Sequence, residues 1–117
     1  MAKRYFNTTL GLSMLPDGQF SVRTVEAKRA RMYLSHAIDA NMFENIANPN
    51  HGNMLDAVSG LLDIDVRQAK GGRVRLALGD QCLVVEVGNL PPQRETREYS
   101  DEEIAAAKFS FRIVMVY

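Results

Sequence analysis

This chain of 117 residues has little cysteine, no excess of charge of either sign and no long apolar run. Each of these absences argues against a class of protein. The single cysteine, Cys82, excludes an internal disulfide and fits a reducing compartment. Acidic and basic residues balance at 14 each, and the formal net charge of zero argues against a protein that coats DNA. No apolar run approaches the roughly 20 residues of a membrane-spanning helix.

The chain has two histidines, His36 and His51, and neither has a second ligand at metal-site spacing. The sequence therefore predicts neither a metal site nor a cofactor. Met1-Ala2-Lys3-Arg4 is not followed by an apolar signal region. The length predicts one domain spanning residues 1–117. Together these features lead us to expect a single-domain, soluble, intracellular protein.

Strand and helix patterns alternate in the first half of the chain, and a hairpin and a last strand follow in the second. This order predicts an α+β fold, a mixed sheet of about five strands with helices packed on its faces. Strand patterns occupy residues 3–9, 20–24, 42–46, 73–78, 81–87 and 109–117. Gly79-Asp80 is the expected hairpin turn. Thr24 is the expected cap of the first helix, and Ser100 opens a capping box before the last.

The stretch from Asn48 to Asn53 runs directly into a helix with one apolar stripe. The stripe consists of Met54, Leu55, Val58, Leu61 and Leu62. Asn50 can cap this helix, which places His51 in its first turn. Free N–H groups and the positive end of the helix dipole favour an anion there. An ordinary capped helix without a ligand explains the same spacing.

Other polar residues stand at predicted strand ends. Asn7 and Thr8 follow the first strand and can offer hydrogen bonds, although both also suit a plain strand end. Asn89 follows a strand terminus, where asparagine often only makes a turn. Arg112 can hold a phosphate or stack on a base. A cross-strand pair with Glu86 is an equally good reading of Arg112.

The last strand, Phe109 to Tyr117, is apolar on both faces. One face carries Phe109, Phe111, Ile113 and Met115, and the other is apolar through Val114 and Val116. Such a strand is usually central in a sheet or lies at a subunit interface. We therefore expect at least a homodimer.

The chain contains four short motifs that carry a resemblance to a known family. The motifs are Tyr5-Phe6-Asn7-Thr8-Thr9 with Met14-Leu15, Asn50-His51-Gly52-Asn53-Met54-Leu55, Gly79-Asp80, and Asp101-Glu102-Glu103-Ile104. Together they resemble the viral anti-CRISPR ring nucleases. The resemblance covers nearly the whole chain. It implies a small dimeric α+β protein that binds and cuts cyclic oligoadenylate.

Residue by residue, the resemblance transfers only part of that active site. The family's histidine falls on His51. The family's serine falls on Gly11 and its arginine near Leu90, so two groups are missing unless Ser13 or Arg94 substitutes. This departure argues against cleavage.

A second resemblance rests on Val87-Gly88-Asn89-Leu90-Pro91 and on Phe109-Ser110-Phe111-Arg112. These two segments resemble the phage anti-Thoeris sponges, and this resemblance fits better. It implies a protein that binds cyclic ADP-ribose isomers without degrading them, some members also holding cyclic oligonucleotides in separate sites. A sponge needs hydrogen-bond donors, stacking surfaces and a closed pocket, but no nucleophile.

The second resemblance therefore implies a phage protein that sequesters a cyclic nucleotide immune signal in the host cytoplasm, and we expect no DNA or membrane partner. The expected ligand-binding residues are Asn7, Thr8, Asn50, His51, Asn89 and Arg112, and no residue is expected to be catalytic. One alternative is a ring nuclease with His51 as general acid or base. Another is a structural phage protein with no small ligand.

Overall fold

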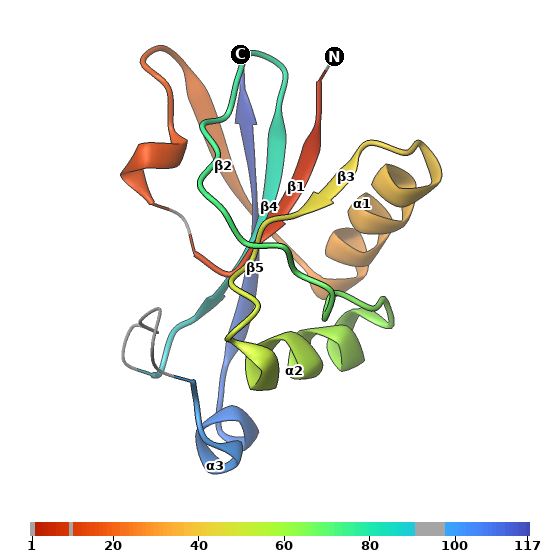
Figure 1. The fold of residues 1–117 in the computed structure, drawn as a ribbon, viewed down its shortest axis with the longest axis vertical. Helices are drawn as coiled ribbons and strands as arrows, with labels where there is room; N and C mark the ends of the chain where they lie inside the picture. The colour runs from red at the N-terminus through yellow and green to blue at the C-terminus, as the bar shows by residue number, and fades with distance from the viewer. Residues whose placement is uncertain (1, 10, 91–97) are drawn as a thin grey trace.

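Five strands form one mixed sheet in the computed structural model, which describes residues 2–9, 11–90 and 98–117 (Figure 1). The strands are β1 (Arg4–Asn7), β2 (Phe20–Val25), β3 (Phe43–Asn45), β4 (Gln81–Val87) and β5 (Phe109–Val116). Their spatial order is β2-β5-β4-β1-β3. β1 runs parallel to β3 and β4, while β5 is antiparallel to β4 and β2. The predicted α+β fold with a mixed sheet of five strands is confirmed.

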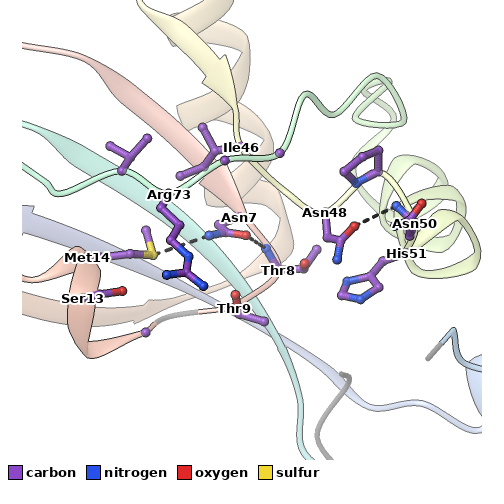
Figure 2. Close-up of a pocket in the computed structure, with 15 residues that line it drawn as sticks. Asn7, Thr8, Thr9, Ser13, Met14, Ile46, Asn48, Asn50, His51 and Arg73 are labelled. Carbon is purple, nitrogen blue, oxygen red and sulfur yellow. Dashed lines mark hydrogen bonds between the residues drawn. The ribbon is translucent and has the colours of Figure 1, made fainter. Parts of the chain in front are cut away.

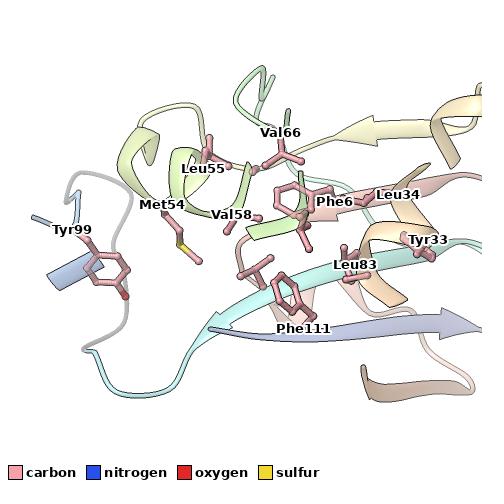
Figure 3. Close-up of a cluster of buried hydrophobic side chains, with 14 residues drawn as sticks. Phe6, Tyr33, Leu34, Met54, Leu55, Val58, Val66, Leu83, Tyr99 and Phe111 are labelled. Atoms are coloured by element: carbon pink, nitrogen blue, oxygen red, sulfur yellow. The ribbon is translucent and has the colours of Figure 1, made fainter. Parts of the chain in front are cut away.

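Two helices, α1 (Ala27–Asp39) and α2 (Gly52–Leu62), pack on the same face of this sheet. Figure 3 shows the core that they form with the strands, which we call the helix-side core. Phe6, Leu83 and Phe111 rise from three strands. They belong to one cluster with Leu34 of α1 and Val58 of α2. The apolar stripe read from the sequence therefore points α2 onto the sheet as expected, except that Leu61 is exposed.

The opposite face is covered by irregular chain and by a short 3-10 helix, η1 (Leu12–Met14). Its buried residues, the loop-side core, are Tyr5, Met14, Ile46, Leu76, Cys82, Val84, Val114 and Val116. The segment that joins α2 to β4 runs across this face in Figure 1. Burial raises the pKa of the Cys82 thiol to about 12, so Cys82 is a packing residue.

The predicted strand at 73–78 is wrong, because this segment is irregular. β4 is already bonded on both sides, by β1 and β5, so no hairpin partner position remains. The alternating pattern still predicts burial correctly at Leu76, which is 1% exposed. The Leu76 N–H donates to the Met14 carbonyl at 2.8 Å. Leu78, by contrast, is 76% exposed. The turn instead depends on the buried Asp80 carboxylate, which accepts from the backbone N–H of Lys3 and Ala77 at 2.9 and 2.8 Å.

β5 is an internal strand, which explains its two apolar faces. Phe111 is buried in the helix-side core, and Val114 and Val116 are buried in the loop-side core. Of the two explanations open to the sequence, the central position within one chain is the one observed. The two-sided pattern therefore needs no subunit interface.

Two predicted helix caps are displaced, and one is confirmed. Thr24 lies in β2, paired with Arg112, and Glu26 is the N-cap of α1. His51, not Asn50, is the N-cap of α2. At α3 (Asp101–Ala105) the expected capping box is present: Ser100 Oγ accepts from the Glu103 N–H at 3.2 Å, and a Glu103 carboxylate oxygen accepts from the Ser100 N–H at 3.1 Å.

In the described part of the chain, no helix combines the length and the apolar character that crossing a bilayer requires.

Candidate functional site: a pocket at the carboxyl ends of β1 and β3

A pocket of about 520 Å³ opens where the parallel strands β1 and β3 end and α2 begins (Figure 2). The carboxyl ends of parallel strands are a common ligand site in α/β sheets, because the connecting loops diverge there and leave a crevice. The lining residues come from the β1 end, η1, the β3–α2 loop and the segment after α2. They are Asn7, Thr8, Thr9, Gly11, Ser13, Met14, Ile46, Asn48, Pro49, Asn50, His51, Gly71, Gly72, Arg73 and Val74.

Asn7 and Thr8 are both buried at the end of β1. The Asn7 side-chain oxygen accepts from the Thr8 N–H at 2.8 Å, and its amide nitrogen donates to Met14 Sδ at 3.5 Å. The Thr8 side chain is 7% exposed, and its hydroxyl has no hydrogen-bond partner among the residues that the structure describes. A buried hydroxyl without a partner costs free energy, so Thr8 Oγ1 is poised to bond a molecule that enters the pocket.

His51 is buried at the start of α2 and lines the same pocket. The neighbouring helix N-terminus, however, is not open to an anion as the sequence led us to expect. The Glu98 carboxylate accepts from the Asn53 N–H at 2.6 Å, and the Asn53 side chain donates to the Tyr99 carbonyl at 2.7 Å. The chain supplies its own anion to the positive end of the helix dipole. Attraction for a ligand's charge must therefore come from another group.

Arg73 is that group. Among the described residues lining the pocket, it is the one with a full positive charge, and no carboxylate in the described part of the chain pairs with it. Figure 2 shows its guanidinium lying toward Asn7 and Thr9. Arg73 is not among the ligand residues expected from the sequence, because it begins the segment 73–78 that was predicted to be a strand.

The signal that identifies Arg73 is the glycine pair that precedes it. Gly71 and Gly72 have φ values of +70° and +108°, which L side chains rarely adopt. A Cβ on Gly71 would also lie 3.2 Å from Pro49 Cδ. The pair brings the chain against the β3–α2 loop and turns Arg73 over the pocket.

The structure brings together four of the six predicted ligand residues, namely Asn7, Thr8, Asn50 and His51. Asn89 does not line the pocket. Its amide nitrogen donates to the Ala106 carbonyl at 2.6 Å, and its oxygen accepts from the Lys108 N–H at 2.8 Å. The turn role weighed for Asn89 is the one observed.

Arg112 does not line the pocket either. It lies on the same sheet face as Asn7, two strands away across Val84. Its Nε is 3.5 Å from a Glu86 carboxylate oxygen, which is the cross-strand ion pair weighed against a ligand role. We therefore place Arg112 beside the pocket and not in it.

Two residues that bear on cleavage are also in the pocket, while a third is not described. Ser13 and His51 both line the cavity, and Figure 2 shows them at opposite sides of it. Gly11 stands where the ring-nuclease resemblance places a serine, and it too lines the pocket. Arg94 lies outside the described residues. Within the described residues, no group of three or more His, Cys, Asp or Glu side chains gathers to hold a metal ion.

These features define an α+β protein with a ligand-sized pocket at the carboxyl ends of its parallel strands. No family model and no curated protein matches the chain. Among solved structures, B116 of Sulfolobus turreted icosahedral virus (STIV) is similar in fold, with a TM-score of 0.75 and 18% identity. The match covers 97% of this chain and 99% of that chain. The fold is thus shared along its whole length with a viral protein.

Proposed function

We propose that this protein is a phage anti-defence protein that binds a cyclic nucleotide immune signal in the host cytoplasm and sequesters it without cleaving it. The observation that carries the proposal is that one cavity of about 520 Å³ is lined by both Arg73 and Thr8, whose buried hydroxyl has no hydrogen-bond partner among the described residues. The resemblance to the anti-Thoeris sponges supports the phage setting, and the structural neighbour is likewise a viral protein.

The pocket has the size and chemistry that such a ligand needs. Small-molecule sites typically measure about 300–1,000 Å³ and carry a few placed polar groups. Arg73 supplies a positive charge for phosphate, and guanidinium–phosphate contacts are short and strong. Amides from Asn48 and Asn50 lie on the opposite wall in Figure 2, where they can meet base or ribose edges.

A ring nuclease that degrades cyclic oligoadenylate is the second candidate, favoured by the presence of His51 and Ser13 in the same cavity. Cleavage requires a 2′-hydroxyl aligned for attack and charge stabilisation on the phosphorane. A histidine addresses only part of that barrier. Sequestration requires neither and so asks less of the residues present.

Heat release from the complex separates the two candidates. After incubation with a panel of cyclic ADP-ribose isomers and cyclic oligonucleotides, we expect the denatured protein to release a nucleotide of unchanged retention time that still activates its effector. Protection should be stoichiometric and saturable. The matched variant is His51→Asn, because it removes the imidazole and places at the N-cap of α2 a residue type that is favoured there.

Linear product that accumulates under substrate excess and disappears in His51→Asn would replace the sponge with the nuclease. Absence of binding to every member of the panel would favour a structural protein with no small ligand.

We further propose that the protein forms a homodimer, on a ground that differs from the sequence prediction. In the described chain β2 is an edge strand, and it exposes Phe20 and Val22 at 40% and 42%. Apolar edge strands attract a second copy, and two identical edges are self-complementary about a two-fold axis.

Sedimentation at micromolar concentration should give a dimer, and Val22→Lys should shift it to monomer. A monomeric wild-type protein would contradict the proposal.

A further inference from the structure

A second cavity, of about 430 Å³, lies on the helix-covered face of the sheet, beside α1 and the amino-terminal ends of β1 and β4. It shares no lining residue with the first pocket. Three arginines from three different elements line it: Arg4 from β1, Arg23 from β2 and Arg29 from α1. Convergence of three cations from distant parts of the chain is unfavourable in the absence of an anion.

The chain does not provide that anion in its described part. No carboxylate among the described residues forms an ion pair with Arg4, Arg23 or Arg29. The polar residues that complete the lining are Ser21, His36 and Gln81, none of which carries a negative charge. The polar part of the lining therefore carries positive charge and no negative charge.

Tyr33 adds an independent observation. Its side chain is 9% exposed, and its hydroxyl has no hydrogen-bond partner among the residues described. Arg4 stacks over its ring with 5.4 Å between the guanidinium carbon and the ring centroid. Burial raises the pKa of Tyr33, so the phenol stays protonated and can donate. Tyr33 thus brings a buried donor without a described partner to the lining of the cavity, and Arg4 lies against its ring.

The remaining wall is apolar, formed by Met32, Ile113, Met115 and the ring of Tyr117. Met32 and Tyr117 are largely exposed, so this side of the cavity is accessible. A free inorganic anion would leave the apolar side unused. A ligand with a flat or apolar body attached to its charge would cover it.

We propose that this cavity is a second binding site, for a small molecule of mononucleotide size that carries phosphate groups on a ring-bearing body. Guanidinium groups suit phosphate in particular, because their planar donors match its oxygens. This proposal does not depend on the sequestration proposed for the first pocket, and the two can be tested separately.

The test is calorimetric titration of the full chain with ADP, and with inorganic pyrophosphate to separate the charge from the ring. We expect ADP to bind more tightly than pyrophosphate. The double variant Arg23→Ala/Arg29→Ala should weaken ADP binding at least about tenfold, as expected for lost charge-assisted hydrogen bonds. The control Lys28→Ala/Arg75→Ala removes two positive charges from exposed positions outside both cavities and should leave ADP affinity unchanged.

Tyr33→Phe separates ligand binding from folding. Because the hydroxyl lacks a partner in the described structure, its removal should not lower the melting temperature, yet ADP affinity should fall several-fold. Wild-type affinity for ADP in the double variant, or no ADP binding at millimolar concentration, would overturn the proposal. So would a Tyr33→Phe variant that loses stability but keeps its ADP affinity. Capture of cyclic nucleotides by the double variant should match wild type, so failure at one site is distinguishable from failure at the other.

Discussion

Replacing Arg73 by alanine is expected to weaken cyclic-nucleotide binding by about 1.5–3 kcal/mol, the range for a lost charge-assisted hydrogen bond to phosphate. Arg73 is exposed and makes no ion pair within the described residues, so its removal should leave the melting temperature nearly unchanged. Arg112→Ala should change binding by less than about 0.5 kcal/mol, because Arg112 pairs with Glu86 outside the pocket lining. Isothermal titration measures the change in binding free energy of each variant, and thermal unfolding measures the melting temperature.

Arg75→Ala is the matched control for Arg73→Ala. Arg75 lies two residues further along the same irregular segment, is also exposed, and does not line the pocket. It reports the effect of net charge alone, and raising the salt concentration should reduce any such effect. Equal losses of affinity in Arg73→Ala and Arg75→Ala would show that Arg73 acts through the general field of the protein and not as a ligand contact.

The sheet was predictable from the sequence because its apolar patterns are strong. Phe109 to Tyr117 is apolar on both faces, and it is indeed an internal strand. The segment from Arg73 to Leu78 has an equally good alternating pattern and is not a strand. Alternation specifies which side chains can be buried, but pairing needs a free neighbouring edge, and β4 has none. The availability of an edge is a property of the whole topology, which no local window contains.

The site was predictable where it depends on strand ends. Asn7 ends β1, Thr8 follows it, and His51 is the N-cap of α2. The parallel pairing of β1 with β3 brings all three to one edge of the sheet. Arg73 was missed because the segment was misread as a strand. The Glu98 carboxylate bonds the Asn53 N–H at the start of α2, although the two residues are 45 positions apart in the sequence. No spacing rule connects them. Contacts of this range follow from the fold and not from a motif.

Replacing Asn45 by alanine is expected to destabilise the protein by about 2–4 kcal/mol, since it leaves two buried backbone groups without partners. The Asn45 side chain is buried at the end of β3. Its amide nitrogen donates to the Val66 carbonyl at 2.7 Å, and its oxygen accepts from the Ala47 N–H at 3.1 Å. These bonds tie the end of β3 to the segment that continues into Gly71-Gly72-Arg73. The urea midpoint should fall, and nucleotide affinity should fall with it because Arg73 loses its support.

Asn45→Asp is the isosteric companion of this variant, and it makes the interpretation specific. The introduced carboxyl keeps an acceptor for the Ala47 N–H, but when ionised it opposes the Val66 carbonyl with a second negative oxygen. Burial and this repulsion favour the protonated form, so its pKa should be higher in the folded than in the unfolded chain. The loss of stability relative to wild type should therefore be largest at pH 7 and shrink as the pH falls toward about 4, where a protonated carboxyl can donate to Val66. Urea unfolding at the two pH values measures the difference. A pH-independent loss, or an unchanged midpoint in Asn45→Ala, would show that the Val66 bond does not support the pocket wall.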